Sequence, residues 1–293
     1  MIKKLYKQQL QTKNFFELDA ANWKRKSDIK KNKLHNTILE RNFYVISKVK
    51  HLKIKSLIDV GCGTGDLCFD ASKLVNTCVG IDFAEGMIKI AKKNFKKKNL
   101  SFSIENFFSY RTHEKFDCLS ANGFIEYLSM KDIKRFFIKS RKFINKNRYL
   151  IFGTRNRLFN LFSLNKFSSK EFKEKTFKKF YDESIALSQM DFKSFIRLKK
   201  NKFEEVLFQQ PKTGINVDKR HQFSPLQINE ILKKTGWKVI DFYPINYHPV
   251  VPSKYNFDQK SKKFSNLIYL SREQNKLPYI PFASSFMVAA KKL

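Results

Sequence analysis

The stretch Ser56-Leu-Ile-Asp-Val-Gly-Cys-Gly-Thr-Gly-Asp66, followed by Thr77-Cys-Val-Gly-Ile-Asp82, decides the fold of this chain. An apolar run opens the first segment and predicts a short buried strand. Three glycines then allow a sharp turn and a close approach of the backbone to a ligand, which a Cβ atom would block. An amphipathic stretch from Asp66 fits a helix packed on a sheet, and the next apolar run ends at the Asp82 carboxylate. These features predict half of a nucleotide-binding site.

The spacing of the glycines narrows the choice of ligand. In Asp59-Val-Gly-Cys-Gly-Thr-Gly65 the third glycine comes one residue earlier than in Gly-x-Gly-x-x-Gly turns, which argues against NAD or FAD. A carboxylate at the position of Asp82 can accept hydrogen bonds from both ribose hydroxyls. At this point the chain resembles the class I S-adenosylmethionine-dependent methyltransferases, whose first motif reads much like residues 57–65 and whose ribose-binding acid falls where Asp82 falls.

The resemblance implies S-adenosylmethionine as the cofactor and a set of residues that would contact it. These residues follow the first four predicted strands: Asp59, Gly61, Cys62, Gly63 and Gly65; Asp82 and Phe83; Asn106 and Phe107; Asn122 and Gly123. The family often has aspartate where Asn106 falls, at the adenine edge. An amide both donates and accepts hydrogen bonds, so recognition of adenine stays open.

The rest of the chain predicts an α/β fold, a Rossmann-like seven-stranded methyltransferase sheet with helices on both faces and a helical lid insertion. Further strands are expected at about 102–104, 116–122, 149–154, 237–243 and 285–290, and helices at 133–144 and 226–235. Ser224 would be the N-cap of the last helix and Pro225 its first residue. We expect one methyltransferase domain over 1–293, divided into an N-terminal helical segment (1–45), a cofactor-binding core (46–154), a lid or substrate insertion (155–221) and the C-terminal part of the core (222–293).

Composition limits the cellular context. No apolar run reaches the ~20 residues that span a bilayer, and the first residues lack the apolar stretch and cleavage site of a signal peptide. The four cysteines lie in or beside predicted core elements without Cys-x-x-Cys spacing. We therefore expect buried, reduced thiols in a cytoplasmic protein, and no metal site.

The formal charge of +33 raises the question of nucleic acid as a partner. The excess is mostly lysine and accompanies 31 Phe and only 9 Gly, which is the composition that A/T-rich codons produce in any protein. The lysines are spread along the chain, so nucleic acid is not the favoured partner. A positive field would equally attract a phosphorylated or nucleotide-linked small substrate, or an anionic membrane surface. The sequence does not indicate an oligomeric state.

Two segments outside the predicted core could cover the site. In the resembling enzymes an N-terminal segment such as 1–45 often covers the cofactor. The alternative is a helix packed on the edge of the sheet, and Trp23 could contribute to either arrangement. The apolar residues in 158–164 are too dense for a one-sided helix, so they should be largely buried or form a cover. Phenylalanines and lysines alternate after them, which favours a lid on the acceptor pocket and leaves contact with a membrane surface open. Pro211-Lys-Thr-Gly214 predicts a turn back to the core.

Methyl transfer needs an acceptor aligned with sulfur and methyl and the exclusion of water, and a hydroxyl acceptor benefits from a general base. Histidine suits that role because its pKa lies near neutrality. His221 and His248 are the leading candidates, since both are expected near the carboxyl edge of the sheet. Glu126 and Tyr127 could instead orient the acceptor. No Asn/Asp-Pro-Pro-Tyr/Phe sequence follows the fourth strand, which lowers the expectation of methylation on nucleobase nitrogen.

Three looser likenesses concern the subfamily. Asn122-Gly-x-Ile-Glu-Tyr127, Arg155-Asn-Arg-Leu-Phe-Asn160 and Tyr247-His-Pro resemble methyltransferases found with bacterial surface-polysaccharide biosynthesis. We therefore expect O-methylation of a small polar acceptor such as a sugar or a nucleotide-linked glycan precursor. The alternatives are a quinone-precursor O-methyltransferase at the membrane surface, an RNA methyltransferase, and a cofactor-binding scaffold without enzymatic activity.

Overall fold

A single mixed sheet organises the protein in a computed structural model that describes residues 7–28, 36–198, 220–248, 251 and 275–293. Seven strands follow the order β3-β2-β1-β4-β5-β8-β7, and the short β6 pairs with β5 beside this path. The pairs among β1 to β6 are parallel, whereas β8 runs antiparallel to both β5 and β7. The predicted α/β methyltransferase sheet is confirmed, with β6 as an eighth strand that the sequence did not predict.

The strands are β1 (Ser56–Val60), β2 (Thr77–Asp82), β3 (Leu100–Ile104), β4 (Phe116–Asn122), β5 (Ile144–Asn156), β6 (Gln222–Phe223), β7 (Trp237–Tyr247) and β8 (Ala283–Lys292). The α-helices are α1 (Lys7–Ser27), α2 (Thr37–His51), α3 (Asp66–Ala71), α4 (Glu85–Asn94), α5 (Met130–Phe143), α6 (Phe159–Phe162), α7 (Lys166–Lys173), α8 (Phe177–Gln189), α9 (Phe192–Arg197) and α10 (Pro225–Lys234). Two 3-10 helices, η1 (Ile125–Tyr127) and η2 (Leu277–Phe282), complete the description.

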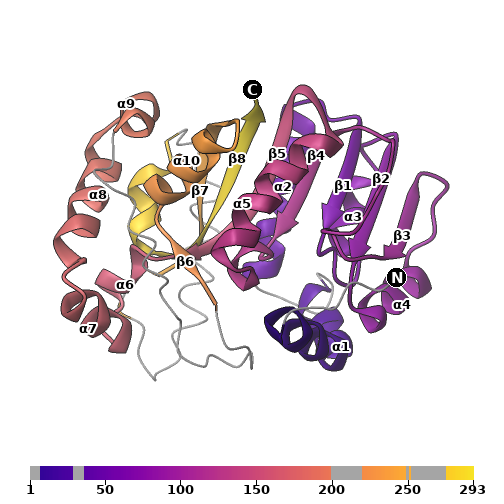
Figure 1. Ribbon diagram of the computed structural model, residues 1–293, viewed down its shortest axis with the longest axis horizontal. Coiled ribbons are helices and arrows are strands. Elements are labelled where there is room, and N and C mark those ends of the chain that lie inside the picture. Colours follow the sequence, from indigo (N-terminus) through magenta and orange to yellow (C-terminus); the bar gives the residue numbers. More distant parts are fainter. Residues whose placement is uncertain (1–6, 29–35, 199–219, 249–250, 252–274) are drawn as a thin grey trace.

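Helices cover both faces of the sheet. Leu57 packs into the core shared with α2, α3 and α4, whereas its neighbour Ile58 packs into the core shared with α5, α8 and α10. This alternation is the period-two side-chain pattern of a strand buried on both sides. The parallel strands point toward α1, which lies along that edge of the sheet (Figure 1). Ligands of open α/β sheets bind at this carboxyl edge.

Local sequence explains the turn after β1 and the start of α10. Gly65 has φ +79°, and a Cβ atom there would lie 2.6 Å from Cζ of Phe102, so the third glycine of the turn is required by conformation and by packing. Ser224 caps α10 by accepting from the backbone N–H of Gln227, and Pro225 is the first helical residue, as the sequence predicts.

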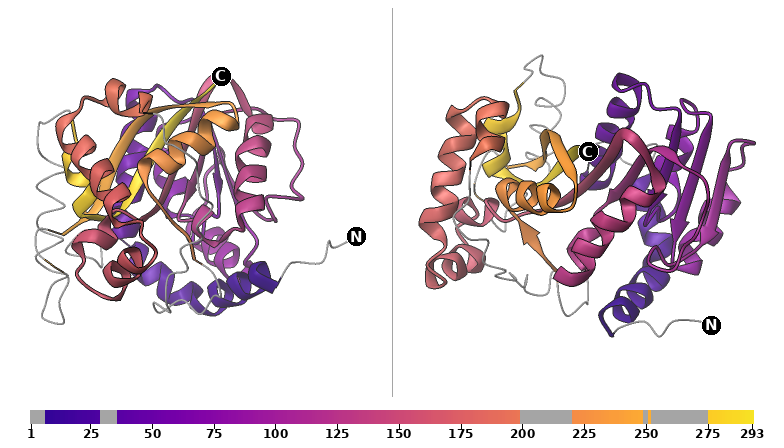
Figure 2. Two further views of the ribbon diagram at one scale, coloured as in Figure 1. Left: turned by 60° about the vertical axis from the view of Figure 1, so that its left-hand side comes forward. Right: turned by 45° about the horizontal axis from the view of Figure 1, so that its top comes forward.

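The described helices of the insertion after β5, α6 to α9, lie away from the carboxyl edge of β1 and β2, and the lid stays a prediction because residues 199–219 lie outside the described residues. Figures 1 and 2 show α6 to α9 at the end of the sheet opposite β3. Glu183 on α8 holds them there, because its carboxylate accepts from the Ser224 hydroxyl and from the Leu226 N–H at 2.8 Å each, at the start of α10. Phe195 on α9 packs against Phe242 of β7. The predicted turn at 211–214 lies outside the described residues.

The dense apolar stretch in this insertion is buried only in part. Leu158 and Leu161 join the core, as the sequence predicts. Leu164 is 71% exposed and lies in the turn between α6 and α7, where its φ is positive (44°). All four cysteines are free and buried, in agreement with the sequence.

Candidate functional site

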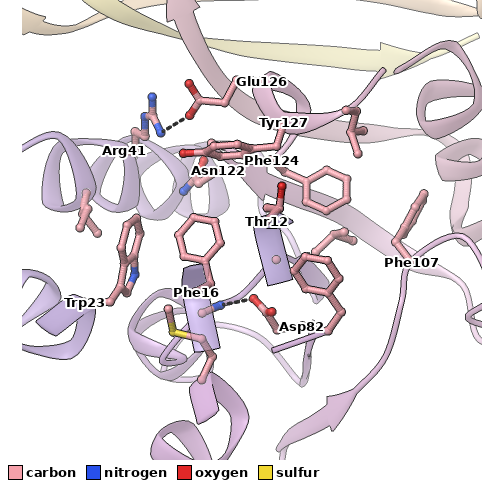
Figure 3. A pocket seen from close by; sticks show the side chains of 18 of the residues that line it. Thr12, Phe16, Trp23, Arg41, Asp82, Phe107, Asn122, Phe124, Glu126 and Tyr127 are labelled. Carbon is pink, nitrogen blue, oxygen red and sulfur yellow. Dashed lines mark hydrogen bonds and ion pairs between the residues drawn. The ribbon is translucent and has the colours of Figure 1, made fainter. Parts of the chain in front are cut away.

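A cavity of about 570 Å³ opens where β1, β2 and β4 end. The strand ends contribute Gly61, Asp82 and Asn122 to its lining. Other parts of its wall come from α1, α2, the loop after β3, η1 and the segments around Arg155 and Arg220. Figure 3 shows side chains from α1, α2, η1 and the ends of β2 and β4 around one space. The volume is large enough for a nucleoside-sized ligand together with a small second substrate.

Asp82 connects the glycine turn to the end of β2. Its Oδ2 accepts from the N–H of Gly63 at 3.0 Å, and its Oδ1 accepts from the N–H of Ala84 at 2.9 Å. Burial raises the pKa of Asp82 to about 6, although these backbone donors favour the ionised form. Each carboxylate oxygen has further lone pairs, so Asp82 can still accept from two hydroxyls in the cavity.

Three residues of the turn motif lie behind the cavity instead of lining it. Asp59 accepts from the Ser120 hydroxyl at 2.6 Å and from the Cys68 thiol, and burial raises its pKa to about 6. Cys62 and Gly65 are also absent from the cavity wall, and burial raises the pKa of the Cys62 thiol to about 11. The geometry gives these residues the role of shaping the turn, whereas the sequence suggested that all three contact the cofactor.

The helix α1 forms one wall of the cavity. Thr12, Phe16 and Trp23 line it from this helix, and the Phe16 ring meets the rings of Trp23 and Tyr127 edge-on at 5.5 and 5.6 Å between centroids. Glu17 anchors the helix, because its Oε1 accepts from the N–H of Gly86 at 2.6 Å. The N-terminal segment therefore covers the cavity, one of the two arrangements that its sequence allows.

Glu126 lies at the centre of a charged cluster beside Tyr127. Its Oε2 is 3.0 Å from Nε of Arg220 and 3.5 Å from Nε of Arg155, and its Oε1 is 3.8 Å from Nη1 of Arg41. The side chain of Glu126 is 1% exposed, and the positive charges of Arg220 and Arg41 hold its pKa below the usual value despite the opposing effect of burial. Glu126 therefore stays an anion that positions the arginines. Burial raises the pKa of Tyr127, so its hydroxyl keeps its proton at neutral pH.

Comparison with known proteins identifies the family. The family described as "Methyltransferase domain" matches residues 51–207. The chain belongs to this family. Membership confirms the methyltransferase class predicted from the glycine turn, and S-adenosylmethionine is the cofactor of that class.

The curated relatives of this methyltransferase match it over the core. A protein of Pelagibacter ubique named "Ubiquinone biosynthesis O-methyltransferase" is 30% identical over 119 residues, which cover 40% of this chain and 49% of the relative. A "Malonyl-[acyl-carrier protein] O-methyltransferase" of Bacillus cereus is 27% identical over 114 residues, or 38% of this chain and 40% of the relative. The chain thus spans about half the length, or less, of these curated relatives.

Solved structures show the same fold. The magnesium protoporphyrin IX methyltransferase from Synechocystis PCC 6803, with bound SAH, has a TM-score of 0.55 and 12% sequence identity over 98% of this chain and 99% of that one. A methyltransferase from Clostridium acetobutylicum has a TM-score of 0.54 and 11% identity over 94% of this chain and 98% of the other. At these identities the likeness concerns the fold alone.

The structure brings most of the predicted site residues of the methyltransferase together. The residues of that set that line the cavity are Gly61, Gly63, Asp82, Phe83, Asn106, Phe107, Asn122, Gly123, Glu126 and Tyr127. Asn106 uses its Oδ1 to accept from the N–H of Phe108 at 2.9 Å, so its side chain also holds the loop after β3. Asn122 donates to Oδ1 of Asn42 at 3.4 Å.

Neither candidate histidine lines the cavity. His221 is 2% exposed, its ring lies 6.2 Å from that of Phe223, and its backbone N–H donates to the carbonyl of Glu126 at 2.7 Å. The His248 ring packs on Phe159 at 4.7 Å between centroids. No histidine belongs to the cavity wall formed by the described residues. The expectation that a histidine deprotonates the acceptor therefore has no support in this geometry.

Sequence reasoning missed the three arginines around Glu126. Arg41 precedes the glycine turn, Arg155 ends β5, and Arg220 precedes β6. In a chain with 59 Lys and Arg, no local pattern distinguishes these three. Arg155 opens the segment Arg155-Asn-Arg-Leu-Phe-Asn160, and Arg220 is adjacent to the candidate His221. Within the described ranges, no cluster of three or more His, Cys, Asp or Glu has metal-binding geometry. None of the described helices is both long and apolar enough to span a membrane.

Proposed function

We propose that this protein transfers the methyl group of S-adenosylmethionine to an oxygen of a small polar acceptor. The observation that carries this proposal is Asp82, whose carboxylate is fixed by two backbone N–H groups at the rim of the cavity. In this role Asp82 accepts from the ribose hydroxyls, and Gly61 and Gly63 let the backbone approach the cofactor. Phe83 and Asn106 also line the cavity, and in this role they would contact the adenine.

Arg41 is the residue that suits the methionine end of the cofactor. A Cβ atom at Gly123 would lie 2.5 Å from its Nη1, so the guanidinium lies directly against the loop after β4. Its Nη2 donates to the Ser285 hydroxyl at 3.1 Å, which fixes the direction of the side chain. A guanidinium held in this way can pair with the methionine carboxylate. We assign Arg41 to the methyl donor for this reason.

The chemistry requires alignment more than activation of the donor. The sulfonium carries an activated methyl group, and a neutral thioether leaves when the acceptor oxygen attacks in line. Phe16, Trp23 and Tyr127 form an aromatic wall that would limit the access of water to the reacting atoms. The protonated Tyr127 can donate a hydrogen bond that orients the acceptor. No histidine of the described residues lines the cavity, so the proton of the acceptor hydroxyl would pass to solvent as the O–CH3 bond forms, a loss that is easier for a phenolic oxygen than for a sugar hydroxyl.

A sugar or a nucleotide-linked glycan precursor is the acceptor that we favour. The support is the likeness of residues 122–127, 155–160 and 247–249 to methyltransferases associated with surface polysaccharides, together with relatives named as O-methyltransferases. A cofactor-binding scaffold is disfavoured, because α6 to α9 leave the cavity open. The net charge of +33 would favour RNA as the acceptor, and this is the third alternative.

A quinone precursor is the second candidate, and two observations favour it. Several curated relatives are named "Ubiquinone biosynthesis O-methyltransferase". In addition, Phe172 and Tyr181 on α7 and α8 are 72% and 47% exposed on helices rich in lysine, a composition that suits an anionic membrane surface. Such a surface would bring the enzyme to a lipid-soluble acceptor.

The test is transfer of labelled methyl from S-adenosylmethionine to a cell extract divided into sugar nucleotides, lipids and RNA. The proposal predicts label in the sugar-nucleotide fraction, and Asp82→Asn should reduce the label in every fraction in proportion to its loss of cofactor affinity. Label in the lipid fraction alone would establish the quinone alternative. Label in RNA alone would refute the proposed acceptor class.

A further inference from the structure

Three guanidinium groups share a single carboxylate at one end of the cavity. Glu126 is the carboxylate, and Arg41, Arg155 and Arg220 are within 3.0 to 3.8 Å of its oxygens. Among these four side chains, positive charges outnumber negative ones by two, and all four residues line the cavity. Figure 3 shows Arg41 and Glu126 facing the same space as Asn122 and Tyr127.

The fold builds this cluster from distant parts of the chain. Arg155 lies at the end of β5 and is paired in register with Gln222 of β6. The N–H of His221 donates to the Glu126 carbonyl at 2.7 Å. These two backbone contacts bring Arg220 to the cavity, where its guanidinium also lies 5.3 Å from the Tyr127 ring centroid. The small strand β6 thus serves to place Arg220 opposite Arg155.

The Glu126 carboxylate alone does not satisfy Arg155. A guanidinium has five N–H donors, whereas a carboxylate offers about four lone-pair sites. Nε of Arg155 is buried without a hydrogen-bond acceptor among the described residues, and its nearest carboxylate oxygen is 3.5 Å away. Burial and the charge of Arg220 lower the pKa of Arg155 to about 10. A second anion in the cavity would relieve both the repulsion and the missing acceptor.

We propose that Arg155 and Arg220 bind an acidic group of the methyl acceptor, a carboxylate or a phosphate, so that the substrate is an anion. This inference rests on the proposed function, in which Arg41 already serves the donor. Arginine suits this task because its planar fork matches carboxylate and phosphate oxygens in pairs. Glu126 is then a positioning residue, since it holds the two forks toward the cavity and is itself not the proton acceptor.

The anion site can be tested without knowing the acceptor, by thermal unfolding of the SAH complex with inorganic phosphate or malonate as probe. Chloride at equal ionic strength is the control. Either probe should raise the Tm of the wild-type protein, and Arg220→Gln and Arg155→Gln should each abolish most of that rise. Arg148→Gln is the matched control variant, because Arg148 pairs with Asp117 elsewhere on the sheet. A rise that persists in both cavity variants would overturn the proposal.

Turnover then separates this inference from the proposed function. A small-molecule extract is divided on an anion exchanger, and each fraction is assayed with labelled S-adenosylmethionine. Acceptor activity should lie in the retained fraction. Loss of that activity after phosphatase treatment identifies the acidic group as a phosphate monoester, loss only after phosphodiesterase treatment identifies the diphosphate of a nucleotide-linked acceptor, and survival of both treatments identifies a carboxylate. Activity confined to the unretained fraction would refute the anionic acceptor while leaving methyl transfer established.

The arginine variants should weaken the use of the acceptor and leave the affinity for S-adenosylmethionine unchanged. Arg220→Gln should lower kcat/KM for the retained fraction by about 10- to 100-fold, the loss expected for one charge-assisted contact. The Kd of S-adenosylmethionine should stay nearly constant, which also shows that the variant folds, and Arg220→Lys should recover part of the loss. An equal loss of donor affinity would assign the arginines to the cofactor and refute the proposal. If the wild-type protein transfers no methyl group at all, the proposed function fails. The thermal unfolding experiment with phosphate and malonate still tests whether Arg155 and Arg220 bind an anion.

Discussion

Replacing one oxygen of Asp82 tests the cofactor site at its best-defined point. In Asp82→Asn the side chain keeps its size, but one oxygen becomes an amino group that cannot accept a hydrogen bond. A hydrogen bond to a charged group contributes about 1.5 to 3 kcal/mol, so loss of one ribose contact should raise the Kd of S-adenosylmethionine by about 10- to 150-fold. The Gly63 and Ala84 N–H groups bond to different oxygens at 3.0 and 2.9 Å, so in the variant one of them would face the amide nitrogen and lose its acceptor.

Isothermal titration calorimetry measures the Kd of S-adenosylmethionine for Asp82→Asn and for a matched control variant, Asp59→Asn. Asp59→Asn is the same chemical change in the neighbouring strand, on a carboxylate that is also buried and also has a pKa raised to about 6. Asp59 does not line the cavity, so its variant should bind S-adenosylmethionine nearly as the wild type does. Equal losses in the two variants would mean that the effect comes from distortion of the turn. An unchanged Kd in Asp82→Asn would refute the ribose assignment.

Three further predictions concern stability. Burial raises the pKa of Asp59 from 3.8 to about 6, so the stabilisation that comes from its proton is present below pH 3.8 and is lost as pH rises through 6. In urea unfolding, the stability of Asp59→Asn relative to wild type should therefore increase by up to about 3 kcal/mol between pH 4 and pH 7. A difference in unfolding free energy that does not change with pH would contradict this. Gly65→Ala should lower the free energy of unfolding by about 2 to 5 kcal/mol, because φ is +79° at this residue and the new Cβ atom would meet the Phe102 ring. A variant with the Tm of the wild type would show that the turn relaxes, and it would contradict this prediction. Glu171→Gln should cost up to about 3 to 5 kcal/mol, since it removes the carboxylate that pairs with the buried Arg157 at 2.8 Å while the Glu174 carboxylate stays 3.5 Å away. The Kd of S-adenosylmethionine should stay unchanged, and a large change in that Kd would place the insertion in the cofactor site.

The donor half of the site could be predicted because its determinants are local. Strand, glycine turn and terminal carboxylate follow one another within residues 56–82, and positive φ at Gly65 makes the turn depend on residue type. The cap of α10 is equally local, since Ser224 and Gln227 bond within one helical turn. Such features depend on neighbours in the sequence, which a single sequence contains.

The acceptor half could not be predicted because distant segments build it. Arg220 reaches Glu126 through the pairing of β6 with β5, and a two-residue strand has no recognisable pattern. Its neighbour His221 was the sequence-based candidate, but consecutive side chains of an extended segment point to opposite sides. The insertion was expected over the cavity, whereas the buried Glu183 and its bonds to the start of α10 hold α8 at the far side of the sheet. These contacts depend on tertiary packing.

Direct binding of S-adenosylmethionine to the purified protein tests the central claim most directly. Calorimetric titration should give one site per chain, displacement of the ligand by S-adenosylhomocysteine, and a weaker site in Asp82→Asn. Absence of S-adenosylmethionine binding to the folded protein, or binding of NAD at the same site in its place, would contradict the account.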